Sequence, residues 1–429
     1  MNKKQLLQTM FAMCTGALLA TGCNNEEMTQ PNQGSGTDEA TSVTFSLGLP
    51  QGDEVGYTRA DVIQDASENT LKSLKVYHFH ATVTSSEDEP ADAAYTLERI
   101  YNVTIKASAA NGGETTTTAG TCINNGDGTY SVKLSLRTDK IADTDKHAFA
   151  FVANDSCTTF NTTAEVGTTT LEALHKQLAD KKVTGGTASP ALFMGDPAGL
   201  CMTGEVKNKK LTSGSNSISA TESKTPLTRI MARLDVKNFV PQDRDFQIKS
   251  IRLLYTNNYT APQGYLFGMD GQTFIWNTPT AATMEITQNA VYDTYGYLPL
   301  ASYTTESGIK DTWVAAIKSS NGRDGVWYKK VLYMYEYPAK KSNDDKINSI
   351  QIEVNYTLNG VSAKTTVKIE DEKLTPIAIN RNYVYILQVG ETEAQGGELT
   401  FKFVFAPWTV NDIDVDLSEG TEVTETPAS

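Results

Sequence analysis

The chain has little of what most enzymes need. Its 429 residues include only 4 histidines and 5 cysteines. It contains no nucleophile elbow, phosphate-binding glycine loop, zinc-protease helix motif or dinucleotide fingerprint. We therefore expect a protein that is not an enzyme and that needs no cofactor. A secreted hydrolase ranks last among the alternatives, because no nucleophile–base pair or carboxylate pair can be named.

Positive charge is also scarce. Lys and Arg number 37 against 51 Asp and Glu, which gives a net charge of -14 at pH 7. Nucleic acids and anionic membrane surfaces reward basic patches, so neither is an expected partner. The hydrophobic fraction of 39% is enough for packed cores, and the length allows two or three domains.

The N-terminal apolar segment is too short to cross a membrane. It runs over residues 10–20, is broken by Gly16, and follows two lysines. A span needs about 20 apolar residues. Small residues lead from this segment to Cys23, as in a lipoprotein signal. We expect residues 1–22 to be a signal peptide and Cys23 to carry a lipid that anchors the chain outside the cytoplasm.

Cysteine provides no disulfide framework. Besides Cys23, the expected mature chain keeps Cys122, Cys157 and Cys201, an odd number without paired spacing. At most one disulfide forms among the three, its pairing stays open, and no zinc site can be inferred from their spacing.

Long helical periodicity is nearly absent, whereas Thr, Val, 19 Tyr and 14 Phe are frequent. This composition predicts an all-β protein. One short helix is expected over residues 171–181, where leucines recur at helical spacing. Thr169 precedes it and forms a capping box with Glu172.

Short strands joined by polar turns indicate β-sandwiches. A passage rich in Gly, Ser and Thr, residues 212–225, predicts a hinge between domains 60–225 and 226–429. After the first strand, we expect strands at 71–79, 96–106, 130–136, 148–154, 228–236, 246–254, 313–317, 326–335, 347–358, 362–369, 383–389 and 399–405. A turn signal at residues 124–128 predicts a hairpin before the strand at 130–136.

An isolated apolar strand precedes these elements. Its alternate side chains share one face and need a groove to cover them. They are Val43, Phe45, Leu47 and Leu49. The polar loop behind this strand, residues 51–61, carries Arg59 followed by Ala60, an accessible bond for a trypsin-like protease.

Three groups of residues are weak candidates for binding. His78 and His80 flank Phe79 and share a strand face, but no third ligand follows nearby, so surface or edge histidines are the preferred interpretation and no metal is expected. A row of aspartates is interpreted as a solvated face, and four tryptophans as packing residues. These are Asp412, Asp414 and Asp416, and Trp276, Trp313, Trp327 and Trp408.

The order of several short motifs resembles the fimbrillin family, the FimA-like major subunits of type V pili. The resemblance covers most of the mature chain. Its motifs are the cysteine box at Cys23, the Arg-Ala pair at 59–60, and residues 70–77, 150–154, 192–195, 201–204, 227–234, 380–385 and 406–410.

The resemblance implies two transthyretin-like β-sandwich domains and an outer-membrane lipoprotein precursor. A protease cuts after a basic residue, here Arg59, and residues 23–59 leave as a lipidated propeptide. A donor strand from the C-terminal region of another copy, near 406–418, then fills the groove and builds a surface fimbrium for adhesion and biofilm formation, together with accessory pilus subunits. The donor candidates are Trp408, Val410, Ile413, Val415 and Leu417.

Two other functions stay open. An anchor or tip subunit of the same pilus would share these features, although a cleavable arginine and a C-terminal extension favour the shaft. A glycan-binding surface lipoprotein would need exposed aromatic rings, for which Trp276 and Trp327 are the candidates.

Overall fold

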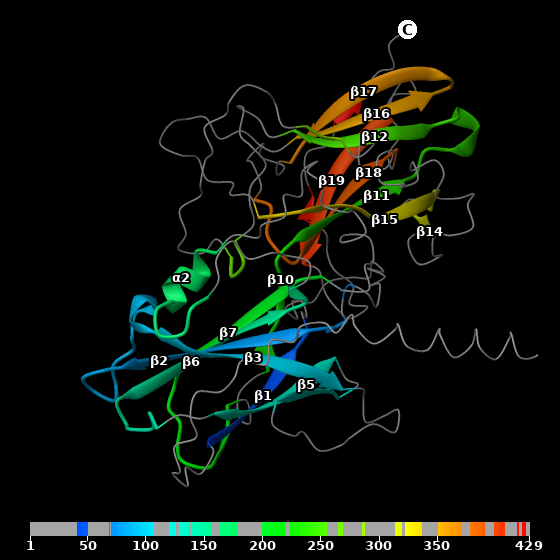
Figure 1. Cartoon of the computed structure of the whole chain (residues 1–429). Helices are drawn as coiled ribbons and strands as arrows, with labels where there is room; N and C mark the ends of the chain where they lie inside the picture. Colours follow the sequence, from blue (N-terminus) through cyan, green and yellow to red (C-terminus); the bar gives the residue numbers. More distant parts are fainter. Residues whose placement is uncertain are drawn as a thin grey trace, which may run out of the picture. The chain divides into compact units, whose positions relative to one another are not determined.

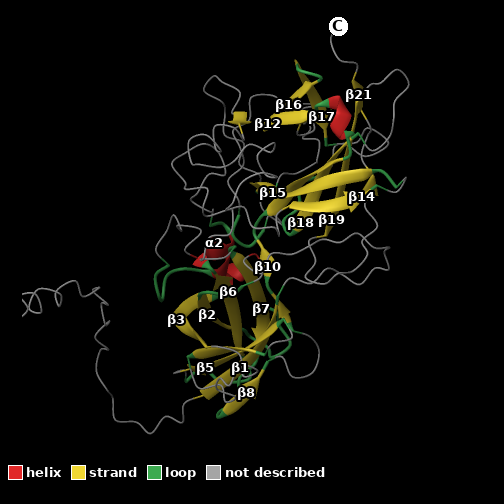
Figure 2. Ribbon diagram, turned by 90° about the vertical axis from the view of Figure 1, so that its right-hand side faces the viewer, coloured by secondary structure: helices red, strands yellow, loops and turns green. Residues whose placement is uncertain are grey.

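The computed structural model describes residues 41–49, 68, 70–106, 120–125, 128–136, 139–155, 164–177, 200–218, 224–254, 265–268, 285–287, 314–319, 322–336, 351–369, 378–390, 399–407, 418–419 and 423–425. The chain divides into two compact units, residues 1–39 and 40–429. All described residues belong to the second unit. It is predominantly β, as the composition predicted (Figures 1 and 2).

The first sheet has ten strands, in the order β10-β7-β6-β2-β3-β4-β5-β1-β8, with β9 also paired to β1. The strands are β1 (Thr41–Gly48), β2 (Leu74–Thr82), β3 (Thr96–Lys106), β4 (Thr121–Asn124), β5 (Thr129–Leu136), β6 (Asp145–Ala153), β7 (Met202–Lys209), β8 (Ser215–Ser217), β9 (Thr225–Pro226) and β10 (Thr228–Arg229). Only Leu227 separates β9 from β10, although these strands pair at opposite ends of the order. The sheet therefore bends back on itself.

The bent sheet surrounds a core of its own. Side chains from β1, β2, β5 and β6 meet there, with Leu227 from the β9–β10 junction. Phe149 and Phe151 on β6 and Phe45 on β1 are its aromatic centre, each at most 1% exposed. We call this set of buried residues the inner core.

The opposite face of β2 and β6 packs into a second core. Tyr77 and Phe79 on β2 meet the short helix α2 (Leu171–His175) there, together with Trp327 and Val384 from later strands. Strand β2 is thus buried on both faces. The described residues also include the 3-10 turns η2 (Asp92–Ala94) and η6 (Gln242–Arg244).

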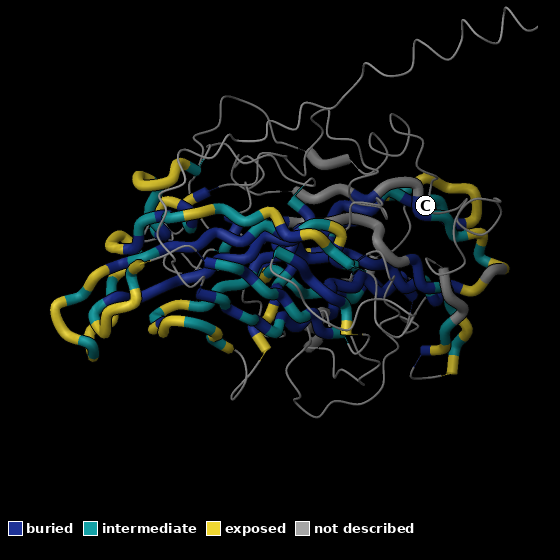
Figure 3. The backbone as a smooth tube through the Cα atoms, turned by 60° about the horizontal axis from the view of Figure 1, so that its bottom comes forward, coloured by how far each residue is buried: buried dark blue, intermediate teal, exposed yellow. Residues whose placement is uncertain are grey.

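Two further sheets follow in the chain and pack face to face. One has the order β14-β15-β11-β18-β19-β20, with β21 also on β19, and the other β13-β12-β16-β17. Their strands are β11 (Ala232–Asn238), β12 (Gln247–Leu254), β13 (Glu285–Thr287), β14 (Val314–Lys318), β15 (Asp324–Met334), β16 (Gln351–Leu358), β17 (Val361–Lys368), β18 (Tyr383–Val389), β19 (Leu399–Pro407), β20 (Ser418–Glu419) and β21 (Val423–Glu425). A shared core of residues from β11, β12, β16, β18 and β19 joins the two sheets. Figure 3 shows long buried stretches of backbone in the middle of the described part and exposed residues mostly where the backbone bends at its periphery.

Most expected strands are present, but some local predictions were wrong. The strand expected from residue 71 begins at Leu74, because the Asn154 side chain accepts the backbone N–H of Lys72 at 2.7 Å and of Ser73 at 3.3 Å. The expected hairpin is present, with β4 antiparallel to β5.

The helix cap was misplaced by one residue. Thr170 is the N-cap, and its hydroxyl accepts the N–H of Ala173 at 3.1 Å. The hydroxyl of Thr169 instead accepts the N–H of Glu165 at 2.8 Å, in the preceding turn. The helix ends at His175, and residues 178–181 of the expected helix lie outside the described ranges.

The passage expected to be a hinge contributes strands. Ser215–Ser217 and Thr225–Pro226 both pair with β1 in parallel. Among the helices that the structure describes, none has the length and apolar character that crossing a membrane takes. Cys122 and Cys201 are buried thiols in separate cores, and Cys157 lies outside the described residues.

Candidate functional site: the first strand and its groove

Strand β1 is hydrogen-bonded along its whole length to β5. Eight residue pairs are in antiparallel register, from Thr41 opposite Leu136 to Gly48 opposite Thr129. The apolar residues of the two strands face one another: Val43 opposite Leu134, Phe45 opposite Val132, and Leu47 opposite Tyr130. Such directly opposed pairs are the unit of sheet stabilisation.

The other edge of β1 is also paired, in parallel, to two short strands. The Ser42 N–H donates to the carbonyl of Gly214 at 2.8 Å. Two further backbone hydrogen bonds join β1 to residues that follow β8 and β9. The Ile218 N–H donates to the Thr44 carbonyl at 3.0 Å, and the Leu227 N–H donates to the Gly48 carbonyl at 2.8 Å. Strand β1 therefore lies inside the sheet rather than at its edge. We call the surface that β1 covers, between β5 and the β8–β9 passage, the β1 groove.

The predicted apolar face of β1 is confirmed. Its four side chains, at residues 43, 45, 47 and 49, are 0%, 1%, 0% and 7% exposed. Phe45 packs edge-to-face on Phe149, at 4.8 Å between ring centroids, and on Phe151, at 5.1 Å. Edge-to-face aromatic pairs add stabilisation beyond the area they bury. The groove is shaped around this ring.

The walls of the groove carry groups that stay uncharged. Burial raises the pKa of the Cys122 thiol on β4 to about 12. Burial also raises the pKa of the Tyr130 phenol on β5, against a smaller opposing effect of a hydrogen bond with the Leu71 backbone. An uncharged, apolar groove suits an apolar strand and selects against a charged one.

A second set of contacts fastens the chain beyond the β1 segment. Glu68 is 1% exposed, and its carboxylate accepts a hydrogen bond from Arg233 at 2.8 Å. Its backbone carbonyl accepts one from the Arg229 guanidinium at 3.2 Å. Asp235 holds the other side of the Arg233 guanidinium through two contacts of 2.9 Å. We call Glu68, Arg229, Arg233 and Asp235 the arginine clamp.

Sequence reasoning missed both the arginine clamp and the strands β8 and β9. The two arginines stand four residues apart in the 227–234 motif, and both are 0% exposed. The signal that could have indicated a buried partner is an arginine next to apolar residues, Ile230 after Arg229 and Leu234 after Arg233, since arginines are almost never buried unless paired.

Several predicted site residues lie outside the described residues. They are Cys23, Arg59 and Ala60, the donor candidates Trp408, Val410, Ile413, Val415 and Leu417, the aspartates 412, 414 and 416, and Trp276 and Trp313. The packing interpretation of Trp327 is confirmed. Its side chain is 1% exposed and donates to Asp235 at 3.0 Å, so it offers no exposed ring for a glycan.

The interpretation of the histidines as surface or edge residues was wrong. Strand β2 lies between β3 and β6, and His78 is 1% exposed. Its ring stacks on Phe149 with centroids 4.8 Å apart. The topology also brings His147 and Glu98 beside His78, and these three are the one group in the described part of the chain that could hold a metal ion.

No protein-family profile and no curated protein sequence matches the chain. Solved structures resemble it over most of its length. The tip fimbrial protein Mfa3 from Porphyromonas gingivalis, with a C-terminal truncation, is 13% identical and covers 86% of this chain and 99% of its own, with a TM-score of 0.37.

Two proteins from Parabacteroides distasonis are similar to a comparable degree. A candidate cell adhesion protein is 16% identical over 91% of this chain and 98% of its own, with a TM-score of 0.43. A fimbrial assembly protein is 11% identical over 88% and 98%, with a TM-score of 0.39.

Proposed function

We propose that this chain is a structural subunit of a surface fimbrium, assembled by removal of β1 and insertion of a donor strand from another copy. The observation that carries the proposal is the placement of β1. It is an N-terminal strand that fills the interior of a sheet with four buried apolar side chains. Burying four such side chains contributes roughly 6 to 12 kcal/mol before opposing terms.

A sheet that loses an internal strand exposes apolar side chains and two rows of unpaired backbone groups. Such a surface accepts another chain by strand addition. Removal of β1 would uncover Phe149 and Phe151 and unpair β5 on one side and β8 and β9 on the other. Polymerisation is the natural response of an open groove of this kind.

The position of Arg59 fits this role. It is the only Lys or Arg between Lys4 and Lys72, so a trypsin-like protease has one bond to cut between the lipid site and Lys72. Downstream of that bond, the arginine clamp holds the chain at Glu68. Upstream of it, the contacts of β1 with the groove are the described connection to the rest of the protein. One cut therefore makes β1 a separate, removable ligand.

The proposed life cycle begins with an outer-membrane precursor lipidated at Cys23 and ends in a cell-surface filament that supports adhesion. The donor strand is proposed to come from residues 406–418 of a second copy. Other pilus subunits are proposed as further partners. Two transthyretin-like domains, which the family resemblance implies, are part of this proposal, and the bent first sheet and the following pair of sheets are the candidates for them.

The test is N-terminal sequencing of filaments from cells that express the chain, with Arg59→Gln as the variant and Lys72→Gln as the matched control. We expect wild-type and K72Q filaments to begin at Ala60 and to form ladders under mild denaturation. We expect R59Q to stay lipidated and monomeric. Filaments made by R59Q, or wild-type filaments that retain Cys23, would refute strand removal as the assembly step.

The donor strand is tested separately with Val415→Asp. A charge on the inserted face should leave cutting at Arg59 intact and abolish ladders, because the groove is apolar. Normal ladders from V415D would exclude the face shared by Ile413, Val415 and Leu417, and would leave that of Trp408 and Val410 as the donor.

A further inference from the structure

Three neighbouring strands bring two imidazoles and a carboxylate together. His147 lies on β6, His78 on β2 and Glu98 on β3, and one ligand atom of each lies within 4.8 Å of the others. The histidines are 0% and 1% exposed, and Glu98 is half-buried. Two imidazole nitrogens and one carboxylate are a ligand set that zinc takes in open, three-ligand protein sites.

An irregularity of the backbone places Glu98 in this group. In the pairing of β2 with β3, His78 lies opposite Arg99 and Phe79 lies opposite Leu97. Glu98 is the extra residue between them, so β3 has a bulge there. Bulges re-aim side chains and recur beside functional sites. Regular alternation would have predicted a different orientation for this carboxylate.

The hydrogen bonds fix where the ring protons lie. The Nε2 of His147 is 2.8 Å from the carbonyl of Lys140, which can only accept, so this nitrogen carries the proton. Nδ1 of His147 is then a lone pair, and the Nε2 of His78, 2.9 Å away, donates to it. The remaining nitrogen of His78, Nδ1, is also left as a lone pair.

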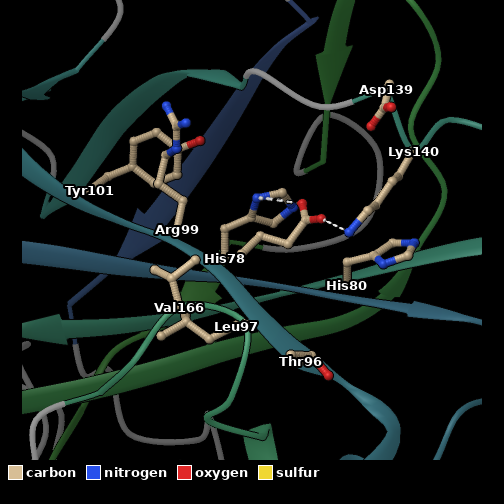
Figure 4. A pocket seen from close by; sticks show the side chains of 11 residues that line it. His78, His80, Thr96, Leu97, Arg99, Tyr101, Asp139, Lys140 and Val166 are labelled. Atoms are coloured by element: carbon tan, nitrogen blue, oxygen red, sulfur yellow. Dashed lines mark hydrogen bonds and ion pairs between the residues drawn. The ribbon is translucent and has the colours of Figure 1, made fainter. Parts of the chain in front are cut away.

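That lone pair faces another acceptor. Nδ1 of His78 is 3.7 Å from Oε2 of Glu98, and Lys140 pairs with the other oxygen of the same carboxylate (Figure 4). Two ligands of one tetrahedral zinc ion are about 3.3 Å apart, given metal–ligand bonds of about 2.0–2.1 Å. Nδ1 and Oε2 thus have nearly the spacing that a shared cation requires.

A proton binds poorly in the gap between Nδ1 of His78 and Oε2 of Glu98. Burial lowers the pKa of His78 well below its usual value, and the neighbouring His147, His80, Lys140 and Arg99 lower it further. A cavity of about 240 Å³ leads to the gap and is lined by His78, Glu98, Tyr101, Asp139 and Lys140 among others (Figure 4). An ion has room to enter, and both histidines are in the neutral form that binds metals.

We propose that Glu98, His147 and one ring nitrogen of His78 bind a zinc ion, with the fourth position open to the cavity. A metal-bound histidine usually donates the hydrogen of its other ring nitrogen to an acceptor that orients the ring. For His147, this acceptor is the Lys140 carbonyl. Lys140 releases Glu98 when the ion enters. Calcium and magnesium prefer oxygen ligands and do not suit two imidazoles.

The ion would cross-link three consecutive strands of the first sheet. Because it binds only the folded arrangement, it would stabilise that sheet against unfolding. This role is independent of strand exchange, since none of the three ligands lies on β1.

The experiment is a titration of the metal-free full chain with zinc chloride, followed by calorimetry. We expect one equivalent to bind and the melting temperature to rise. Glu98→Gln should weaken binding at least about tenfold, since even loss of an outer contact typically costs 10–100-fold. Lys140→Met should tighten binding, because it removes the cation that competes for Glu98 while keeping the backbone carbonyl.

The matched control is His175→Gln. His175 also lies beside two carboxylates, but its Nδ1 faces Asp92 at 3.2 Å and its Nε2 faces Glu205 at 2.5 Å. Asp92, His175 and Glu205 do not form a metal-holding group, since His78, Glu98 and His147 are the one such set among the described residues, so H175Q should bind zinc as the wild type does. Circular dichroism of metal-free E98Q checks that it is folded.

A cobalt titration tests the site without any substitution. The wild type should develop the visible absorption of tetrahedral Co²⁺ at one equivalent, and zinc should displace it. Absence of saturable zinc binding, equal affinities of E98Q and wild type, or a loss of affinity in H175Q matching that in E98Q would overturn the proposal.

Discussion

Replacement of Phe45 by Ala should loosen β1 more than any neighbouring change. The ring is 1% exposed and has two edge-to-face partners, on β6. Truncating a buried Phe to Ala costs about 3–5 kcal/mol through lost transfer energy and the cavity left behind. Each 1.4 kcal/mol is a factor of ten in an equilibrium constant. Phe45→Ala should therefore weaken the hold of the groove on cut β1 by roughly two to four orders of magnitude.

The assay starts from the full chain cut with trypsin at Arg59. The N-terminal fragment is then separated from the body by size exclusion at successive times and quantified by mass spectrometry. Thr44→Ala is the control, because Thr44 is half-buried and points away from the inner core. F45A should release its fragment much faster than T44A. Equal release rates would show that the aromatic contacts of Phe45 do not hold the strand.

Three more outcomes follow from described contacts. Cys122 should resist alkylation at pH 8 while β1 is in place, because a pKa of about 12 lowers its thiolate fraction roughly a thousandfold, and removing β1 should expose it. Glu68→Ala should lower the free energy of unfolding by about 1–3 kcal/mol, because the buried Arg233 guanidinium loses one of its two carboxylate partners and keeps Asp235. Gly204→Ala should cost about 1–3 kcal/mol, because a Cβ there would lie 2.5 Å from the carbonyl oxygen of Pro226.

Each of these has its own control. Alkylation of Cys122 is measured by peptide mapping in a chain with Cys201→Ala. Equal labelling of Cys122 before and after removal of β1 would contradict its position inside the inner core. Urea unfolding of E68A is compared with that of Lys318→Ala, whose ion pair with Asp324 is exposed and should matter little. Gly48→Ala should melt closer to the wild type than G204A, since its Cβ would meet only the Lys224 side chain, at 3.3 Å.

The parts of the fold that the sequence predicts are those that repeat a local rule. Val43 to Leu49 alternate without interruption, so the orientation of each side chain followed from the period of a strand. The residues of the 124–128 turn likewise predicted the hairpin of β4 and β5. In both cases neighbours in the sequence determine the geometry.

The parts that were missed depend on partners far along the chain. Strands β8 and β9 have three and two residues and no alternation, and they are strands only because β1 lies beside them. Glu98 joins His78 and His147 through a bulge, which shifts the register that alternation assumes. Glu68 is buried because Arg233, 165 residues away, supplies its counter-charge.

The two flanks of β1 differ in direction, and this gives the groove a polarity. An occupant that runs as β1 does is antiparallel to β5 and parallel to β8 and β9. A strand inserted in the reverse direction would be parallel to β5 and antiparallel to β8 and β9. Parallel and antiparallel ladders space their hydrogen bonds differently. The flanks were formed around one orientation, so they discriminate against the other. In the proposed filament, successive subunits would then all be joined in the same sense, and the filament would have two distinguishable ends.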